Sequence, residues 1–296
     1  MSVLVTGGAG FIGSHLVAAL LSQGERVVVL DDFSTGKYEN LPRLHPKNLR
    51  VVEGSVCDPS DLGLAVESDL TVAYHLAAQA SVPASFVDPP STWATNLRGT
   101  LNLLDALELT CAPPHLVLAS TSAVYGPVEG AVAETAPLNP ASPYAESKLA
   151  AEYVSRAFVS ASCMRFFNVY GPRQRDTGAD GAVVAAFLAA AREGRAATIN
   201  GDGSQMRDFV YVGDVVRALL CVAEERAIGV FNVGRGAAVS IRDLWAHIGS
   251  APPAFAPARQ GDAAYSCANI NKLTALGWSP QSDLTPTLEA MREASL

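Results

Sequence analysis

Residues 142–148, SPYAESK, contain a tyrosine and a lysine of the kind that supports acid–base chemistry. Residues four apart lie on the same face of a helix, so Tyr144 and Lys148 would point into one site. Ser142 suits the cap of a helix and Pro143 its first turn, which predicts that a helix begins here. Taken alone, however, a pattern this short is more often an ordinary surface pair.

A glycine-rich stretch, TGGAGFIGSHL, follows the first apolar run of the chain. Gly7, Gly10 and Gly13 are spaced three apart as the chain enters a helix predicted from Ile12 to about Ser22. Glycine permits a tight turn and lets backbone amides at a helix N-terminus approach a pyrophosphate. The stretch therefore predicts dinucleotide binding, with a plain tight turn as the alternative.

A carboxylate lies about 20 residues further on, where a dinucleotide site needs one. Asp31 ends the second predicted strand, RVVVLDD, and would accept hydrogen bonds from ribose hydroxyls. Its charge would repel a 2′-phosphate, which favours NAD over NADP. Asp32 either shares this role or caps the turn.

These residues need a scaffold, and the chain alternates short β-branched runs with helical patterns through its first half. This rhythm predicts an α/β fold, a Rossmann doubly wound parallel sheet with helices on both faces. Two long helices are expected over roughly 92–109 and 143–160, and SCMRFFNVYG is expected to be a strand. We predict a dinucleotide-binding domain over 1–171, to which about 208–235 returns, and a smaller substrate-binding lobe over 172–296.

Composition excludes several classes of protein. The chain has 296 residues and a net charge of −8, which argues against nucleic acid or an acidic membrane as partner. The longest apolar stretch, 182–191, is too short to cross a bilayer. An apolar run that begins at Val3 leaves no room for a signal peptide, so we expect a cytoplasmic protein. The five cysteines form no CxxC, which suggests neither a disulfide framework nor a metal site.

Further motifs occur in order with the glycine stretch and the Tyr144/Lys148 pair: STSAVYG at 120–126, then RFFNVYGPRQ, INGDGSQMRDFVYV and RQGDAAYS. With them, the chain from Val3 to about Trp278 resembles the extended short-chain dehydrogenase/reductases, and within these the nucleotide-sugar 4-epimerases. The resemblance implies bound NAD, a nucleotide-sugar substrate and a homodimer formed by the two long helices.

The resemblance also implies roles for individual residues. Tyr144 would be the acid/base at a sugar hydroxyl, Lys148 the cation that favours its phenolate, and Thr121 the hydroxyl that binds the reacting group. The implied cofactor residues are Gly7, Gly10, Phe11, Ile12, Asp31, Asp32, Ser34, Thr35, Gly36, Ser55, Val56, Leu76, Ala77, Ala78, Asn96, Tyr144 and Lys148. The implied substrate residues are Ser81, Thr121, Ser122, Asn168, Arg207, Arg259, Asp262 and Ser266.

Some positions discriminate between reactions or depart from the family pattern. Dehydratase relatives commonly carry Asp and Glu where this chain has Ser122 and Ala123, which favours epimerisation. Ser55 replaces the usual adenine-binding Asp, and Asn200 replaces an aromatic residue that often stacks on the base. Ser266 leaves space for a 2-acetamido group where some relatives have tyrosine.

The leading hypothesis is 4-epimerisation of UDP-N-acetylglucosamine and UDP-glucose through a transient 4-keto sugar. An epimerase or dehydratase of another nucleotide sugar, such as UDP-glucuronate or a dTDP-hexose, is the alternative among enzymes. A catalytically idle NAD-binding sensor on the same fold is the alternative from another class.

Overall fold

The computed structural model describes residues 2–42, 47–158, 160–175, 183–249, 251–258 and 263–293. The chain forms two compact units. The first comprises Met1–Thr121, Ser142–Arg165 and Val216–Phe231, and the second comprises Ser122–Ala141, Phe166–Val215 and Asn232–Leu296.

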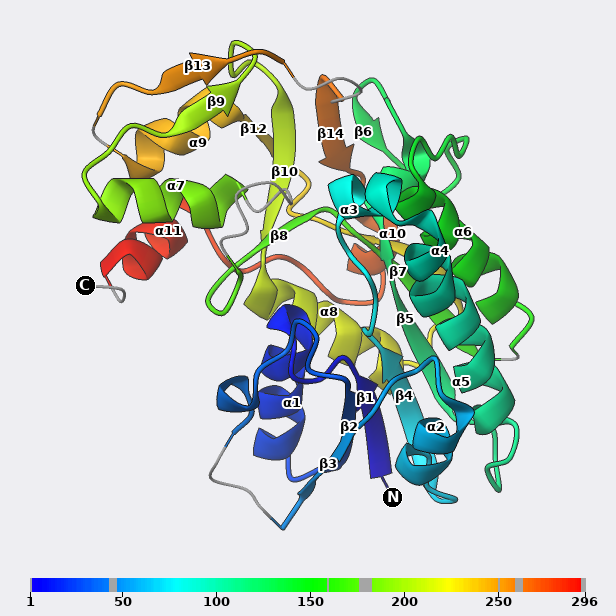
Figure 1. Ribbon diagram of the computed structural model, residues 1–296. Coiled ribbons are helices and arrows are strands. Elements are labelled where there is room, and N and C mark those ends of the chain that lie inside the picture. Colours follow the sequence, from blue (N-terminus) through cyan, green and yellow to red (C-terminus); the bar gives the residue numbers. More distant parts are fainter. Residues whose placement is uncertain are drawn as a thin grey trace. The chain divides into compact units, whose positions relative to one another are not determined.

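The largest sheet has seven strands in the order β11-β7-β5-β4-β1-β2-β3 (Figure 1). Its strands are β1 (Ser2–Thr6), β2 (Arg26–Asp31), β3 (Leu49–Glu53), β4 (Leu70–His75), β5 (His115–Thr121), β7 (Ala161–Phe166) and β11 (Gly229–Val233). The pairs of β1 with β2 and β4, of β2 with β3, and of β4 with β5 are parallel. Since the winding reverses between β1 and β4, their carboxyl ends form the place where doubly wound folds bind ligands. The predicted Rossmann fold is confirmed.

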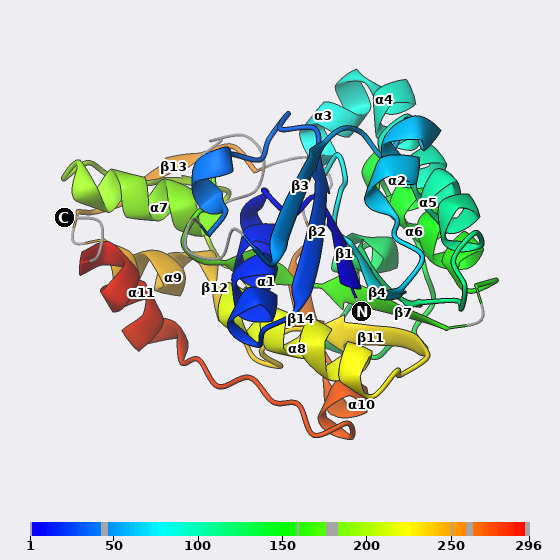
Figure 2. The same ribbon diagram turned by 90° about the horizontal axis from the view of Figure 1, so that it is seen from below.

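Helices cover both faces of this sheet. Figure 2 shows α1 (Phe11–Ser22) and α8 (Val212–Glu224) on one face, and α2 (Pro59–Ala65), α5 (Gly99–Leu107) and α6 (Pro143–Ser155) on the other. All five residues of β1 are buried, as expected for a strand with both faces covered. The apolar layer between the sheet and α2 and α5 includes Leu4, Val28, Leu62, Leu103 and Leu107.

The helix that carries Tyr144 begins as its sequence predicts. Ser142 caps α6 by accepting a hydrogen bond from the amide of Ala145 (3.1 Å), and Pro143 is its first residue. The helix ends at Ser155, earlier than the predicted 160, because β7 already begins at Ala161.

The other predicted long helix, over roughly 92–109, is interrupted. Residues 89–107 form α4 (Pro89–Trp93), a π-helical segment η2 (Ala94–Arg98) and α5. A π-helical turn inserts an extra residue, and such turns are frequent at functional sites. A shorter helix, α3 (Val82–Val87), precedes α4.

Where the structure describes its residues, the second unit is built on small sheets and four α-helices. One sheet has the order β12-β10-β14-β6, with β8 also pairing with β10, and β9 pairs with β13. Its strands are β6 (Ala131–Val132), β8 (Asn168–Tyr170), β9 (Thr198–Asn200), β10 (Met206–Tyr211), β12 (Ala238–Ser240), β13 (Ala254–Ala256) and β14 (Tyr265–Ala268). Its helices are α7 (Val183–Arg192), α9 (Ile241–Ile248), α10 (Asn271–Thr274) and α11 (Leu284–Glu293).

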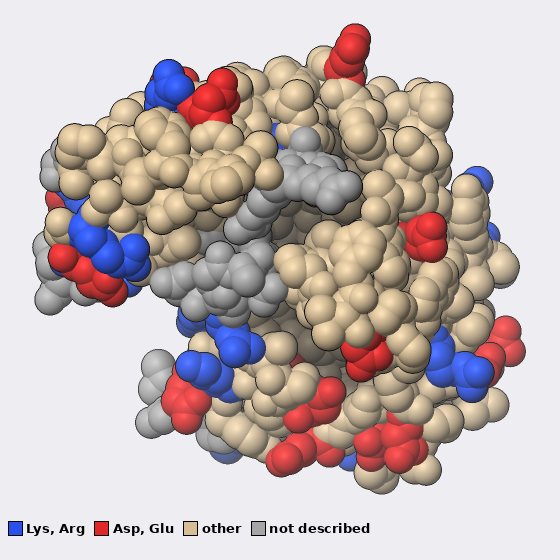
Figure 3. Space-filling model, turned by 45° about the horizontal axis from the view of Figure 1, so that its top comes forward, with Lys and Arg blue, Asp and Glu red and all other residues tan. Residues whose placement is uncertain are grey.

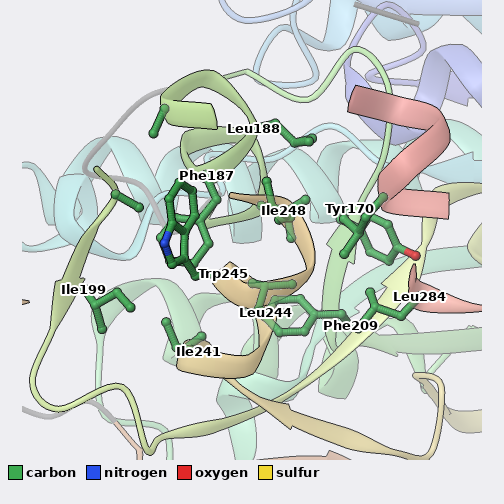
Figure 4. Packing of buried hydrophobic residues seen from close by; sticks show 14 residues of the cluster. Tyr170, Phe187, Leu188, Ile199, Phe209, Ile241, Leu244, Trp245, Ile248 and Leu284 are labelled. Atoms are coloured by element: carbon green, nitrogen blue, oxygen red, sulfur yellow. The ribbon is translucent and has the colours of Figure 1, made fainter. Parts of the chain in front are cut away.

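The core of the second unit combines aliphatic and aromatic side chains (Figure 4). Phe187 of α7 meets Trp245 of α9 edge to face, with ring centroids 5.3 Å apart. Trp245 also donates a hydrogen bond to the carbonyl of Ala251 (2.8 Å), so the one polar atom of its ring is satisfied.

The two units differ in their boundaries from the sequence-based division. SCMRFFNVYG forms two strands: β7 joins the large sheet, and β8 pairs with β10. Of the segment 208–235, β11 joins the large sheet, whereas β10 belongs to the small one. Residues 122–141 belong to the second unit because β6 pairs with β14. Such distant pairings leave no local pattern in the sequence.

No helix in the described part of the chain is long and apolar enough to cross a membrane. The same residues contain no cluster of three or more side chains suited to hold a metal ion. On the face shown in Figure 3, acidic side chains are scattered and no extended field of Lys and Arg is seen, in keeping with the net charge of −8.

Candidate active site

The loop between β1 and α1 approaches the loop after β4 very closely. Gly7 has φ of +69°, and a Cβ added there would lie 2.7 Å from the backbone nitrogen of Ala77. A Cβ at Gly13 would collide with the carbonyl oxygen of Gly7. Gly10 precedes α1, and no side chain caps the first turn, where Phe11 and Ile12 lie. The amides of a helix N-terminus are therefore left to bind an anion.

Asp31 fastens this loop to the end of β2. Its buried carboxylate accepts hydrogen bonds from the amides of Ala9 (2.8 Å) and Phe33 (2.9 Å). Burial raises the pKa of Asp31, and the hydrogen bonds from these two amides act against the rise. Asp31 thus has a structural role beside the ribose contact predicted for it.

The loop after β2 contains the other acidic candidate. Asp32 accepts hydrogen bonds from the amide (3.0 Å) and hydroxyl (2.6 Å) of Ser34, which is the turn cap considered as the alternative for this residue. Thr35 is exposed, and Gly36 is buried where a Cβ would lie 2.7 Å from Oδ1 of Asp31.

A carboxylate from α2 binds the loop after β3, although position 55 in that loop lacks one. The amide of Ser55 donates to Oδ2 of Asp61, a residue of α2 (2.9 Å), and the Ser55 hydroxyl accepts from the amide of Cys57 (3.2 Å). Val56 is buried, and its carbonyl accepts from the side chain of Asn102 (3.1 Å).

Hydrogen bonds to Thr6 of β1 hold the loop after β4 in place. The amide of Leu76 donates to the carbonyl of Thr6 (3.1 Å), and the amide of Ala77 donates to the hydroxyl of the same threonine (3.3 Å). Ala78 follows, half-buried. This loop and the glycine loop therefore face each other at the switch point of the sheet.

Asn96, in the π-helical segment, connects this loop with α6. Its buried side chain accepts from the amide of Gln79 (2.8 Å) and donates to the carbonyl of Gln79 (3.0 Å) and the hydroxyl of Ser147 (2.9 Å). Ser81 caps α3 by accepting from the amide of Ala84 (3.1 Å). Asn96 therefore orients the segment next to Lys148.

Thr121, Tyr144 and Lys148 come together at the end of β5. The side chains of Thr121 and Tyr144 are hydrogen-bonded, and Lys148 lies one helical turn further along α6, 3% exposed. Burial raises the pKa of Tyr144, and the hydrogen bond with Thr121 acts against this. Burial lowers the pKa of Lys148 to about 8, against the effect of Glu152 and Cys163. The site thus joins a hydroxyl, a phenol and an ammonium group whose pKa is lowered by burial.

Substrate candidates in the second unit gather along β10. Arg207 is paired in register with Ser266 of β14, and its Nη1 donates to the carbonyl of Met206 (2.8 Å). Asn168 of β8 pairs with Phe209 of the same strand. Ser122 begins a short 3-10 helix, η3 (Ser122–Tyr125), directly after β5. Arg259 and Asp262 lie outside the described residues.

The sequence matches the NAD dependent epimerase/dehydratase family over residues 3–234. It is 40% identical to a UDP-glucose 4-epimerase of Mycolicibacterium smegmatis in an alignment of 313 positions that covers all of both chains. The fold is similar to a Thermus thermophilus UDP-glucose 4-epimerase complexed with NAD, at 37% identity and a TM-score of 0.89, covering 99% of this chain and 100% of that one. It is also similar to a Methanobrevibacter ruminantium UDP-N-acetylglucosamine 4-epimerase, at 33% identity and a TM-score of 0.91, covering 99% and 98%.

The chain belongs to the NAD dependent epimerase/dehydratase family. Members with other reactions are similar as well. A UDP-glucuronic acid decarboxylase of Arabidopsis thaliana is 38% identical over 82% of this chain and 57% of its own length. A dTDP-glucose 4,6-dehydratase of Streptomyces venezuelae is 30% identical with a TM-score of 0.89, over 99% of this chain and 97% of that one.

Family membership identifies NAD as the cofactor, as the sequence predicts. The residues present fit it. An uncapped helix N-terminus and a glycine loop without room for side chains suit a pyrophosphate, and a buried carboxylate at the end of β2 suits a ribose without a 2′-phosphate.

Sequence reasoning missed a group of buried polar residues beside this candidate site. Glu152 of α6 forms an ion pair with Arg165 of β7, and the hydroxyl of Ser120 donates to the Glu152 carboxylate. The available signal was spacing, since Glu152 follows Lys148 by four residues.

Proposed function

We propose that this protein is a NAD-dependent UDP-hexose 4-epimerase that acts on UDP-N-acetylglucosamine and UDP-glucose through a transient 4-keto sugar. The observation that carries the proposal is the hydrogen bond between Thr121 and Tyr144, with Lys148 one turn away on a buried helix face. The similarity to UDP-glucose and UDP-N-acetylglucosamine 4-epimerases supports it.

In this proposal Tyr144 exchanges a proton with the C4 hydroxyl of the sugar, and Thr121 holds that hydroxyl by a hydrogen bond. Lys148, as an ammonium group, stabilises the phenolate of Tyr144 and so lowers the energy of the state that accepts the proton. Bound NAD supplies the hydride acceptor and donor at C4. Inversion then requires that the keto sugar present its other face before the hydride returns.

The residues after Thr121 favour this reaction over elimination. Removal of water across C5 and C6 needs an acid and a base beside the ring, and Ser122 and Ala123 offer neither. In the second unit, we assign the nucleotide diphosphate to Arg207, Arg259 and Asn168, and the nucleotide ribose to Asp262. A guanidinium group presents a planar fork of donors that suits phosphate oxygens.

The decisive experiment follows the products from several nucleotide sugars. The purified protein is incubated with UDP-N-acetylglucosamine, UDP-glucose, UDP-glucuronate and dTDP-glucose, and NMR reports the configuration at C4. We expect inversion with the first two. Loss of carbon dioxide from UDP-glucuronate, or of water from dTDP-glucose, without inversion of the first two would assign the protein to the decarboxylases or dehydratases of its family. Tight NAD binding without turnover would indicate a sensor.

A further inference from the structure

A buried ion pair lies directly behind the Tyr144/Lys148 pair. Glu152 is 2% exposed and Arg165 is 3% exposed. The Glu152 carboxylate accepts from Nε (2.9 Å) and Nη2 (2.6 Å) of Arg165, and the hydroxyl of Ser120 donates to it as well. Both oxygens of the carboxylate are thus held in place.

The placement of this pair relates it to the candidate active site. Tyr144, Lys148 and Glu152 follow one another at intervals of four residues, so they lie on one face of α6. Ser120 directly precedes Thr121 on β5. Packing alone does not require charges here, because apolar residues of similar volume stabilise a buried site equally well or better.

We propose that Glu152, fixed by Arg165 and Ser120, is a positioning residue that keeps Lys148 in its ammonium form although Lys148 is buried. The consequence for catalysis rests on the proposed function, since it needs Lys148 to support the phenolate of Tyr144. The effect of Glu152 on the charge of Lys148 does not depend on the proposed function.

Several titratable groups face Lys148 from the packed elements. His75 of β4 is neutral, since burial and Lys148 lower its pKa to about 3. Cys163 of β7 is also neutral, since burial and Glu152 raise its pKa to about 12. Tyr144 is a phenol in the resting site, because burial raises its pKa. The remaining groups named here are the ion pair of Glu152 and Arg165, and of these Glu152 favours the charged lysine.

This arrangement predicts shifts of opposite sign. Loss of the Glu152 charge removes a stabilising anion and leaves Arg165 as an uncompensated cation, so the pKa of Lys148 falls. Loss of Arg165 leaves Glu152 uncompensated, so the pKa of Lys148 rises. Loss of both removes the anion and the cation together, so the pKa of Lys148 falls, but less far than after loss of Glu152 alone. If the pair were merely structural, the variants would be destabilised to a similar extent and the pKa of Lys148 would not change.

The pKa of Lys148 can be measured directly, because the chain contains only Lys37, Lys47, Lys148 and Lys272. Lysine labelled with ¹³C at Cε gives one titrating NMR signal for each, and Lys148→Met identifies the signal of Lys148. The titration is repeated for Glu152→Gln, Arg165→Gln and the double variant. Glu146→Gln is the matched control, since it removes the same charge from an exposed position of the same helix.

We expect the Lys148 pKa to fall by at least about one pH unit in Glu152→Gln and to rise by a similar amount in Arg165→Gln. It should fall less far in the double variant than in Glu152→Gln and stay unchanged in the control. The alkaline limb of kcat should move in the same directions. Either single variant is sufficient if the other fails to fold, and a Lys148 pKa that does not move overturns the inference. Shifts as expected in a protein that turns over no nucleotide sugar would leave the inference intact and refute the proposed function.

Discussion

Burial shifts the pKa values of Tyr144 and Lys148 in opposite directions. Burial raises the pKa of the phenol and lowers that of the ammonium group to about 8, because each environment disfavours the charged form. The phenolate is therefore best stabilised while Lys148 still carries its proton. Since the lowered lysine pKa lies near 8, we expect kcat to decline as the pH rises above about 8. A pH–rate profile without an alkaline limb up to about pH 10, the range of an unperturbed lysine, would contradict this assignment.

Tyr144→Phe removes the proton-transferring oxygen and almost no volume. We expect kcat to fall by about 10²–10⁴-fold while the bound NAD is retained. Tyr153→Phe is the matched control, because Tyr153 lies on the same helix but is exposed, and it should keep full activity. NAD released by heat and C4 inversion are measured on all three proteins. A Tyr144→Phe variant with nearly full activity would remove Tyr144 from its proposed role.

Ser266 pairs in register with Arg207, which we assign to the diphosphate. If Ser266 borders the sugar 2-substituent, Ser266→Tyr places a ring where an acetamido group must fit. Overpacking costs about 1–3 kcal/mol, so UDP-N-acetylglucosamine turnover should fall roughly 10- to 100-fold while UDP-glucose turnover is largely spared. Ser266→Ala, which adds no bulk, is the control. Equal losses with both substrates would show that Ser266 does not select the sugar.

Helix α6 depends on its cap to hold Tyr144, the second residue of the helix. Ser142→Ala removes the acceptor for the amide of Ala145 and should cost about 1 kcal/mol of stability. Ser240→Ala removes the corresponding cap of α9, in the other unit, at similar cost. Thermal unfolding should report similar losses for both variants, whereas only Ser142→Ala should lower kcat. If Ser142→Ala and Ser240→Ala had the same kcat, loss of the α6 cap would not affect the position of Tyr144.

The elements that the sequence predicts best are those with a strong local signal. The run VLV, the spaced glycines and Asp31 predict β1, α1 and the end of β2, because each feature is decided within a few residues. Ser142 and Pro143 predict the start of α6 for the same reason.

Features that depend on distant partners escaped prediction. The π-helical turn around Asn96 shifts the helix register, and there the Asn96 side chain forms hydrogen bonds with Gln79 and Ser147, 17 and 51 residues away. The Glu152–Arg165 pair exists because α6 packs beside β7, which a linear pattern does not reveal. β6 has two residues and is defined by its pairing with β14, more than a hundred residues away.

Taken as a whole, the molecule combines two units that each have their own apolar core. The first is a sheet covered by helices, and the second is organised around Trp245 and Phe187. The cofactor candidates lie mostly at the carboxyl ends of the large sheet, and most substrate candidates lie in the second unit. We therefore propose that one unit binds NAD and the other recognises the nucleotide sugar, which agrees with ligand binding at the switch point of a doubly wound fold.

We predict a homodimer in which α5 and α6 pair with the same helices of a second copy. The two helices pack against each other, and each leaves a large apolar side chain exposed, Leu101 at 36% and Tyr153 at 56%. Leu101→Asp with Tyr153→Asp places two charges where the partner's apolar surface would lie, so the variant should be monomeric. Leu64→Asp is the control, because Leu64 is exposed on α2, and it should remain dimeric. Light scattering at micromolar concentration distinguishes these states, and a monomeric unmodified protein would refute the prediction.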